Sequence, residues 1–120
     1  MEFSIIIPTV GRCDSLRRLL ASISEHFAQS NIELEVLVVN NARDADIERG
    51  VDKIVGEFHT DLGGRLRVIR VPTPGKCKAV NAAVKQAAGR ILAFFDDDVE
   101  VTAGWLKVAA EFFRGKNFDA

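Results

Sequence analysis

The amino-acid sequence predicts an α/β fold in which a mostly parallel sheet of four strands is flanked by helices. The first observation is that four short apolar runs alternate with segments whose apolar residues recur at helical spacing. The second is that most of these runs are continuously apolar, which is typical of strands buried on both faces of a parallel sheet. The third is that the connections are short, so right-handed crossovers through the helices would join the strands into one layer.

The first half of the chain contains two predicted strands with a helix between them. Phe3–Pro8 is an apolar run that ends at a proline, and Leu34–Val39 is a second run that is closed by Asn40–Asn41. Asp14 or Ser15 is the expected N-terminal cap of the helix. The apolar face of this helix is predicted to consist of Leu16, Leu19, Leu20, Ile23 and Phe27.

A second helix and a third strand are predicted next. Apolar residues at helical spacing from Ile47 to Phe58 indicate the helix, and Gly63–Gly64 breaks it. Leu66–Val71 is the third strand, and because its polarity alternates more it is expected nearer an edge of the sheet. Pro72–Gly75 then forms a turn.

The last part of the chain adds a helix, a strand and a final helix. Lys76–Ala88 is alanine-rich and helical, and Gly89 is expected to end it as a C-terminal capping glycine. Ile91–Phe95 is predicted to be a fourth, buried strand. Thr102 is the expected cap of the last helix. The apolar residues of that helix are Trp105, Val108, Ala109, Phe112 and Phe113.

The composition is that of one globular domain, and it excludes several classes of protein. The 120 residues are 48% hydrophobic and 28% charged with a net charge of −1, which gives no general attraction to nucleic acid. No run approaches the ~18 apolar residues that a membrane helix needs, and the N-terminus lacks the layout of a signal peptide. Cys13 and Cys77 fit a reduced protein. We therefore expect a cytoplasmic location, either free or peripheral to the inner face of the membrane.

The residues that directly follow each predicted strand carry the functional information. Ligands of parallel α/β sheets bind beyond the carboxyl ends of the strands, near the point where the strand order reverses. In this chain those positions are Thr9–Arg12, Asn40–Arg43, Pro72–Lys78 and Asp96–Asp98. All four are expected to converge on one edge of the sheet.

Three consecutive carboxylates, Asp96, Asp97 and Asp98, follow the fourth apolar run. Like charges this close repel one another, so a compensating charge is expected, and Mg²⁺ or Mn²⁺ shared with a phosphate would supply it. In an extended segment Asp96 and Asp98 would point together and Asp97 away. The alternative is that the three acids only begin the loop before the last helix.

The third turn is basic. Gly75 allows a close approach of the backbone to a ligand, and Lys76 and Lys78 add positive charge where a helix N-terminus already favours anions. Asn81 offers a donor and an acceptor toward the same edge. Alternatively the lysines and the amide are a solvated helix surface. Together with the acids, this turn is what a metal–diphosphate site requires.

The first two turns fit a nucleoside pocket. Thr9 and Arg12 can hydrogen-bond a base or a phosphate, and Asn40 and Asn41 can pair with the edge of a base. On their own these residues are weak signals, because threonine and asparagine are ordinary turn formers.

Taken together, the four turns resemble the N-terminal half of a family 2 glycosyltransferase with the GT-A fold, a Rossmann-like half-domain. Four matching segments stand in the family's order, and the resemblance as a whole extends over nearly the whole chain. They are Ser4–Thr9 with Arg12, Val36–Asn41, Gly75–Asn81 with Ala88–Gly89, and Phe94–Asp98.

This resemblance implies that residues 1–120 bind a nucleotide-diphospho-sugar, whose sugar passes with inversion to an acceptor hydroxyl on a glycan, lipid or protein. Asp96 and Asp98 correspond to the family's D-x-D motif and would hold Mn²⁺ or Mg²⁺, with Asp96 near the ribose or a metal-bound water. The residues implied in nucleotide-sugar binding are Pro8, Thr9, Arg12, Asn40, Asn41, Gly75, Lys78, Asn81, Asp96 and Asp97.

Two departures from the family pattern stand out. The aspartate that usually follows the second strand is replaced by Asn40 or Asn41, which leaves the preferred nucleotide open. The chain also stops at Ala120, before the family's acceptor-binding half and its catalytic base, so no catalytic residue is assigned. We therefore expect an incomplete form that is inactive by itself.

Two other readings of the sequence remain. One is a non-catalytic nucleotide-binding or interaction module of the same fold. The other is a phosphotransfer receiver or phosphatase of flavodoxin-like topology, which is disfavoured because such proteins carry acids after the first strand, where this chain has Pro8–Thr9. Self-association through exposed apolar residues is a further expectation, with Trp105, Phe112 and Phe113 as candidates.

Overall fold

The centre of the computed structural model is a sheet of four parallel strands in the order β3-β2-β1-β4. The structure describes residues 1–27, 31–102 and 104–114. The strands are β1 (Phe3–Thr9), β2 (Leu34–Asn40), β3 (Leu66–Arg70) and β4 (Ile91–Phe94). None of the helices within these residues has the length and apolar character to cross a bilayer.

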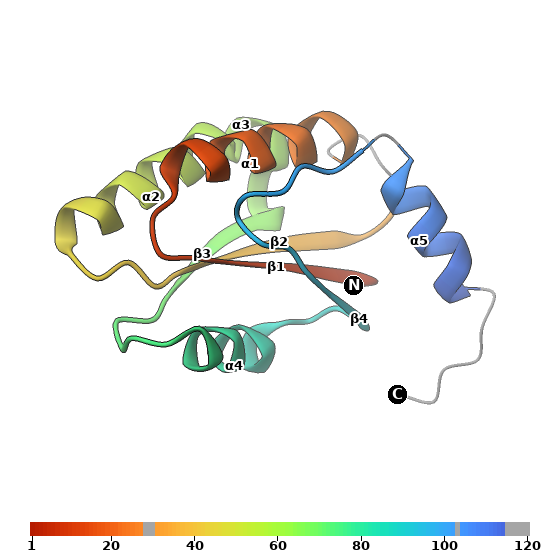
Figure 1. Ribbon diagram of the computed structural model, residues 1–120. Helices are drawn as coiled ribbons and strands as arrows, with labels where there is room; N and C mark the ends of the chain where they lie inside the picture. The colour runs from red at the N-terminus through yellow and green to blue at the C-terminus, as the bar shows by residue number, and fades with distance from the viewer. Residues whose placement is uncertain (28–30, 103, 115–120) are drawn as a thin grey trace.

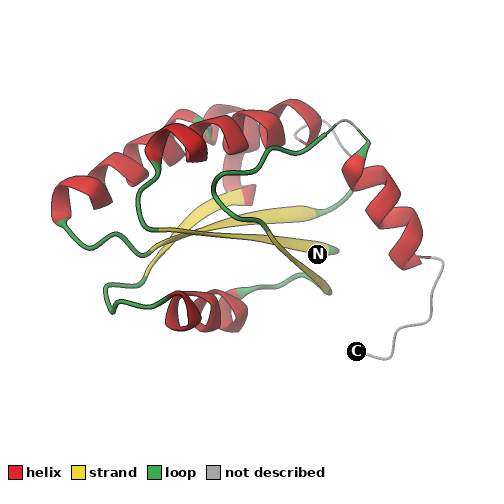
Figure 2. Ribbon diagram, viewed as in Figure 1, coloured by secondary structure: helices red, strands yellow, loops and turns green. Residues whose placement is uncertain are grey.

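Helices cover both faces of the sheet unequally (Figure 1). α1 and α2, followed by the short α3, lie over one face, whereas α4 lies alone against the other, as the colouring by secondary structure in Figure 2 makes clear. A 3₁₀ turn, Gly63–Arg65, leads from α3 into β3. The helices are α1 (Cys13–Phe27), α2 (Ala45–Glu57), α3 (His59–Leu62), α4 (Lys76–Gln86) and α5 (Trp105–Arg114).

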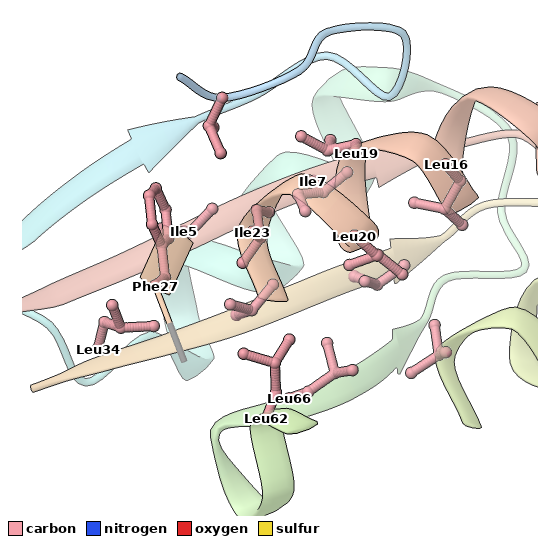
Figure 3. Packing of buried hydrophobic residues seen from close by; sticks show 14 of the residues in the cluster. Ile5, Ile7, Leu16, Leu19, Leu20, Ile23, Phe27, Leu34, Leu62 and Leu66 are labelled. Atoms are coloured by element: carbon pink, nitrogen blue, oxygen red, sulfur yellow. The ribbon is translucent and has the colours of Figure 1, made fainter. Parts of the chain in front are cut away.

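The larger core lies between the sheet and α1. Ile5 and Ile7 point to this face because alternate residues of a strand share a face. They meet the apolar face of α1 that the sequence predicted, and all of these side chains are fully buried (Figure 3). Leu106 of α5 belongs to the same cluster. The smaller core on the opposite face is formed by Ile6, Leu37, Val39, Ile69, Val71, Ala79 and Ala83.

The strand order places a topological switch point between β1 and β4. From β1 the chain steps outward through β2 to β3, with α1 and α2 on one face, and α4 then returns it on the other face to β4, beside β1. The strand order therefore reverses between β1 and β4, and parallel α/β sheets bind ligands at such a point.

Three expected helix ends differ from the structure. α1 begins at Cys13, so Asp14 and Ser15 lie inside its first turn and do not cap it. α5 begins at Trp105, and the contribution of Thr102 is its backbone carbonyl, which accepts a hydrogen bond from the Trp105 N–H at 3.2 Å. α4 ends at Gln86, two residues earlier than predicted.

β4 is shorter and more exposed than the apolar run suggested. It ends at Phe94, and it is an edge strand that pairs only with β1. None of its four residues is fully buried, and the Phe94 side chain is half exposed. A continuous apolar run is typical of a strand that is buried on both faces. The sequence of the strand alone does not reveal whether other segments pack on both of its faces.

Trp105 is part of the core and not of an exposed surface. Its ring stacks on Phe27 with the centroids 5.9 Å apart, and it meets Phe95 edge-on at 5.1 Å. Val108 and Phe112 on the same helix are 66% and 52% exposed. Self-association through this surface stays a prediction.

Gly89 has a different role from the predicted capping glycine. Its φ is not in the left-handed region, and the residue after α4, Ala87, is already extended. Gly89 is instead pressed against β1, where an added Cβ would lie 2.4 Å from the Ser4 nitrogen and 2.6 Å from the Phe3 carbonyl carbon. A glycine is therefore required by space and not by backbone conformation.

A buried carboxylate, Glu35 of β2, holds this end of α4. Glu35 Oε2 accepts hydrogen bonds from Ser4 Oγ at 2.6 Å and from the Ala88 N–H at 2.7 Å, and Arg67 lies 3.4 Å from its other oxygen. Burial by itself raises the pKa of Glu35, but these hydrogen bonds and the Arg67 charge outweigh it and hold the pKa below its ordinary value of 4.5. These hydrogen bonds hold the chain just after α4 in place, which is the role that the sequence assigned to a capping glycine.

We predict that Gly89→Ala lowers the free energy of unfolding by at least about 2 kcal/mol, because the methyl group overlaps the β1 backbone. Gly56→Ala is the matched control, since an added Cβ at this site in α2 meets nothing within 4 Å. The control should raise stability slightly, by about 0.5–1 kcal/mol. Urea denaturation measures both, and equal effects of the two substitutions would contradict the packing role of Gly89.

We also predict that Glu35→Gln lowers the free energy of unfolding at pH 7 by about 1–3 kcal/mol. A group with a lowered folded-state pKa stabilises the protein above its unfolded pKa, and this contribution is lost as the pH falls through the folded pKa. The difference between wild type and variant should therefore shrink below pH 4.5. Glu25→Gln, at an exposed position, is the control, and a difference that is independent of pH would count against this explanation.

Candidate functional site

A pocket of about 480 Å³ opens at the switch point, beyond the carboxyl ends of β1 and β4. It brings together residues from all four turns that follow the strands. Its lining consists of Pro8, Thr9, Val10, Arg12, Asn41, Lys76, Asp96, Asp97 and Asp98.

The pocket exists because β4 separates from β1 early. Their pairing stops at Ile6 and Phe94, while β1 continues to Thr9 alongside β2. The chain then turns at Asp97 and Asp98. The following loop crosses to the α1 face of the sheet (Figure 1), where the Val101 N–H donates to Ser22 Oγ at 3.1 Å.

Thr9 connects the first turn to the second and the fourth. Its hydroxyl donates to Asp97 Oδ2 at 2.7 Å and accepts from the Gly11 N–H at 3.1 Å. Its carbonyl accepts from the Asn41 N–H at 2.9 Å. Thr9 is almost completely buried, so these hydrogen bonds stabilise the wall of the pocket by joining three of its turns.

Arg12 faces two of the three acids. Its Nη1 lies 3.7 Å from Asp97 Oδ1 and donates to Asp98 Oδ2 at 3.4 Å. Asp97 is buried whereas Asp98 is half exposed, so the guanidinium spans the inner and outer carboxylates. The expectation that Asp97 points away is wrong, because residues 97 and 98 form a turn and the two-residue period of a strand does not apply.

Lys76, at the start of α4, pairs with the third acid, Asp96. Its Nζ lies 3.2 Å from Asp96 Oδ1, and both side chains are about two-thirds exposed. Lys76 is the first residue of α4, where the positive end of the helix dipole also favours an anion. The sequence singled out this lysine as charge at a helix start, and the structure adds it to the pocket.

The repulsion among the three acids is thus relieved by two cations of the chain itself. Asp97 and Asp98 share Arg12, and Asp96 pairs with Lys76. Two cations thus pair with three carboxylates, so the ligand-free site keeps a net negative charge. That a divalent ion shared with a phosphate supplies the remaining compensation stays a prediction. Exposed pairs of this kind contribute only about 0–1 kcal/mol each, so a ligand can break them at little cost.

The donor set fits a divalent ion that is shared with a phosphate ligand. Asp96 and Asp98 line one pocket with their carboxylates 67% and 53% exposed. Mg²⁺ and Mn²⁺ are commonly bound through one or two carboxylates, with substrate phosphates and water as the other ligands. The described residues contain no group of three or more histidine, cysteine, aspartate or glutamate side chains that could hold a metal ion.

The two asparagines after β2 have different environments. Asn40 Nδ2 donates to the Glu48 carbonyl and to Asp52 Oδ1, and Asn40 Oδ1 accepts from the Ala42 N–H. Its side chain is thereby engaged with α2, and Asn40 is not part of the pocket lining. Asn41 does line the pocket, and its amide donates to the carbonyls of Val71 and Thr73.

Three other residues implied by the resemblance lie outside the pocket wall. Gly75, Lys78 and Asn81 are exposed at the start of α4, and none of them lines the pocket. Gly75 has a φ of +126°, a conformation that favours glycine, so this residue allows the turn before α4. Val10 lines the pocket although the sequence analysis did not select it, and its only signal was an apolar residue at the exposed end of a buried run.

Comparisons with known proteins show to which family the chain is similar. A family model described as glycosyl transferase family 2 matches residues 4–120. The chain is 30% identical over 119 residues to the poly(ribitol-phosphate) beta-N-acetylglucosaminyltransferase TarS of Staphylococcus aureus, covering 99% of this chain and 20% of that protein. The curated relatives that it matches are longer, and the chain spans between 11% and 40% of their lengths.

Solved structures agree with the sequence relatives. The structure of TarS residues 1–349 in complex with UDP is similar with a TM-score of 0.81 and 31% identity, covering 96% of this chain and 32% of that one. The mannosyltransferase PcManGT of Pyrobaculum calidifontis, in complex with GDP-Man and Mn²⁺, has a TM-score of 0.77 and 27% identity, covering 93% and 32%. The predicted fold, a GT-A half-domain with a parallel four-stranded sheet flanked by helices, is confirmed.

We predict that Thr9→Val lowers the free energy of unfolding by about 1–3 kcal/mol, because it removes the hydroxyl that donates to the buried Asp97 Oδ2 and accepts from the Gly11 N–H. Thr9→Ser keeps the hydroxyl and should stay within about 1 kcal/mol of wild type. Chemical denaturation of both variants measures the difference. If Thr9→Val and Thr9→Ser lower the free energy of unfolding equally, the Thr9 hydroxyl does not stabilise the pocket.

Proposed function

The chain belongs to glycosyl transferase family 2, and we propose that residues 1–120 form the donor-binding part of a GT-A glycosyltransferase domain. In this proposal the pocket binds a nucleotide-diphospho-sugar, whose sugar is transferred to an acceptor hydroxyl. The observation that carries the proposal is that one pocket at the switch point joins two cations, Arg12 and Lys76, with the exposed carboxylates of Asp96 and Asp98. Cations suit a diphosphate, and carboxylates suit a metal that accompanies it.

The nucleotide is proposed to be a uridine or guanosine diphosphate. One structural neighbour is described with UDP and another with GDP-Man. Each is at least 27% identical to this chain and covers at least 93% of it, so the same part of the fold is shared. The pocket volume of about 480 Å³ suits a ligand of that size.

Arg12 and Lys76 are proposed to exchange partners when the donor binds. Without a ligand they pair with Asp98 and Asp96. The phosphate oxygens would take the place of these carboxylates on the two cations, which frees Asp96 and Asp98 for a divalent ion. Since each broken ion pair is replaced by another, the exchange requires no unpaired charge in the site.

Asp96 and Asp98 are the residues proposed to hold Mn²⁺ or Mg²⁺. When bound, such an ion neutralises the charge that develops on the departing nucleoside diphosphate. Support comes from the two exposed carboxylates on one pocket and from the neighbour described with Mn²⁺. Asp97, which is buried against Thr9, would hold the turn that carries these two residues.

The finer features of the reaction rest on the family resemblance. Transfer is proposed to invert the anomeric carbon, and the acceptor hydroxyl is proposed to belong to a glycan, lipid or protein. A cytoplasmic location, free or peripheral to the membrane, is part of the same proposal. No catalytic base is assigned, and the roles of Gly75, Lys78 and Asn81 stay predictions.

A non-catalytic nucleotide-binding module is the second candidate. It is favoured by the ion pairs of the ligand-free pocket, in which Arg12 and Lys76 already pair with the acids that would otherwise hold a metal. Such a module would bind a nucleotide through the two cations without a metal. The dependence of binding on metal therefore separates the two candidates.

We predict that this chain binds UDP or GDP in the presence of Mn²⁺ or Mg²⁺, and that the double variant Asp96→Asn/Asp98→Asn weakens this binding at least about tenfold. The reason is that the variant removes both exposed carboxylates from the pocket. Titration calorimetry with and without metal measures the effect. Asp46→Asn, an exposed aspartate in α2, is the control and should bind as wild type does.

Each outcome of this titration is informative. Binding that needs neither metal nor the two carboxylates would support the non-catalytic module. Absence of binding by both nucleotides, with metal present and with an unchanged melting temperature, would contradict the proposed donor site.

A further inference from the structure

We propose that two copies of this chain associate through the free edge of β4, the edge that does not face β1. The two β4 strands would run antiparallel and be related by a two-fold axis beside Ala93, so that Leu92 of each copy lies opposite Phe94 of the other. This inference concerns an interaction surface of the sheet, and it does not rest on the proposed function.

The free edge of β4 presents backbone groups that another strand can bond. In the part of the chain that the structure describes, β4 pairs with β1 and with no other strand, at one border of the sheet (Figure 1). The N–H groups of Ile91 and Phe95 donate to carbonyls on the β1 side. Because the backbone groups of successive strand residues point to opposite sides, those of Leu92 and Phe94 point away from β1. Such a row of groups is a template for pairing with another chain.

The two borders of the described sheet differ in their protection against such pairing. β3, at the other border, carries Arg67 and Arg70, and charged side chains on an edge strand discourage association of sheets. β4 has the sequence Ile-Leu-Ala-Phe, without a charge or a proline, and the Phe94 side chain is 51% exposed. Of these two borders, the β4 border is therefore the one suited to association.

The charges that flank β4 make it complementary to a second copy of itself. Arg90 precedes the strand, is exposed and forms no ion pair with a described residue, whereas the exposed Asp96 follows the strand. In an antiparallel pair centred on Ala93, Arg90 of one copy falls opposite Asp96 of the other, and the two-fold axis repeats this contact. An in-register parallel pair would instead place like charges side by side. The charges therefore select the antiparallel arrangement.

The same register covers the exposed ring of Phe94. Leu92 packs against the smaller core on the α4 face of the sheet, and Phe94 points to that face because alternate residues of a strand share a face. Side chains of opposite residues in antiparallel strands are in contact, so Phe94 would pack on Leu92 of the second copy. Each of these opposed pairs would exchange both of its N–H···O=C bonds, which satisfies the outward backbone groups of the two residues.

The second copy would also reach the pocket described above. Asp96 lines this pocket, in which three carboxylates face two cations of the same chain. Arg90 of the second copy would be a third cation at the border of the pocket, in addition to Lys76. Association would therefore offset the net negative charge that the ligand-free pocket keeps.

Size-exclusion chromatography with light scattering measures the association. The mass should rise from that of one chain toward that of two as the protein concentration increases. Phe94→Lys adds a charge to the free edge and should weaken dimerisation at least about tenfold. Val84→Lys, at a 41% exposed valine of α4, is the matched control and should associate as wild type does. The inference is overturned if wild type stays monomeric up to about 1 mM, or if Phe94→Lys dimerises as wild type does.

A mixing experiment tests the antiparallel register. Arg90→Glu and Asp96→Lys should each be monomeric alone, because positions 90 and 96 of two identical copies then carry like charges. A mixture of the two variants should recover the dimer, since the introduced carboxylate meets the introduced amine and the unchanged Arg90 and Asp96 form the second pair. Both positions are exposed, so neither substitution should prevent folding. A mixture that associates no better than the separate variants overturns the inference.

Amide hydrogen exchange identifies the edge itself. Exchange at Leu92 and Phe94 should slow as the protein concentration rises, because their N–H groups gain partners in the dimer. Exchange at Ile91 and Phe95 should change less, since these groups already donate to the β1 side within one chain. A dimer in which Leu92 and Phe94 stay unprotected would place the interface elsewhere and overturn the inference. If Phe94→Lys loses the folded transition, this measurement on wild type still decides.

Discussion

A chain of hydrogen bonds across the rim of the sheet sets the geometry of everything else in the site. Asp97 accepts from the Thr9 hydroxyl, the Thr9 carbonyl accepts from the Asn41 N–H, and the Asn41 amide donates to the Thr73 carbonyl. Thr9 is the last residue of β1, and the other three stand in the turns that follow β2, β3 and β4. Buried polar groups that are all satisfied specify one arrangement, because each alternative leaves a donor or an acceptor unpaired. The exposed residues of the pocket, such as Asp96 and Asp98, are therefore carried on a wall that is already rigid.

The charges of the pocket are divided between this buried wall and an outer layer of exposed side chains. Asp97 is buried and fixed, whereas Arg12, Lys76, Asp96 and Asp98 are mostly exposed and are held by ion pairs of small net stability. An anionic ligand with its own cation can then enter by exchange of partners, and the number of unpaired charges does not rise. This arrangement explains how three consecutive acids persist without a ligand, and it does so with residues that the chain itself provides.

Much of the fold was predictable because it depends on local patterns. The continuous apolar runs gave the strands, and the helical spacing of Leu16 to Phe27 gave the buried face of α1, which the structure confirms. The failures occurred where distant segments decide the outcome. Gly89 is required because it packs on Ser4, Asp97 turns inward to meet Thr9, and β4 is only partly buried although its sequence is apolar. Convergence of the turns was predictable from topology, but the distinction between Asn40 and Asn41 required knowledge of what each amide touches.

The presence of an amide at position 40, directly at the end of β2, also has a physical explanation. Asn40 donates to Asp52 Oδ1, and Asp52 is in turn paired with Arg70, which also contacts Glu48 at 3.2 Å. An aspartate at position 40 would oppose the Asp52 carboxylate in a nearly buried place, and it would have no N–H to donate. An amide is therefore the compatible residue once Asp52 and Arg70 are present. With position 40 committed to holding α2 against the sheet, the polar group available to a ligand at the end of β2 is that of Asn41, and its orientation is set by the main chain of the next turn.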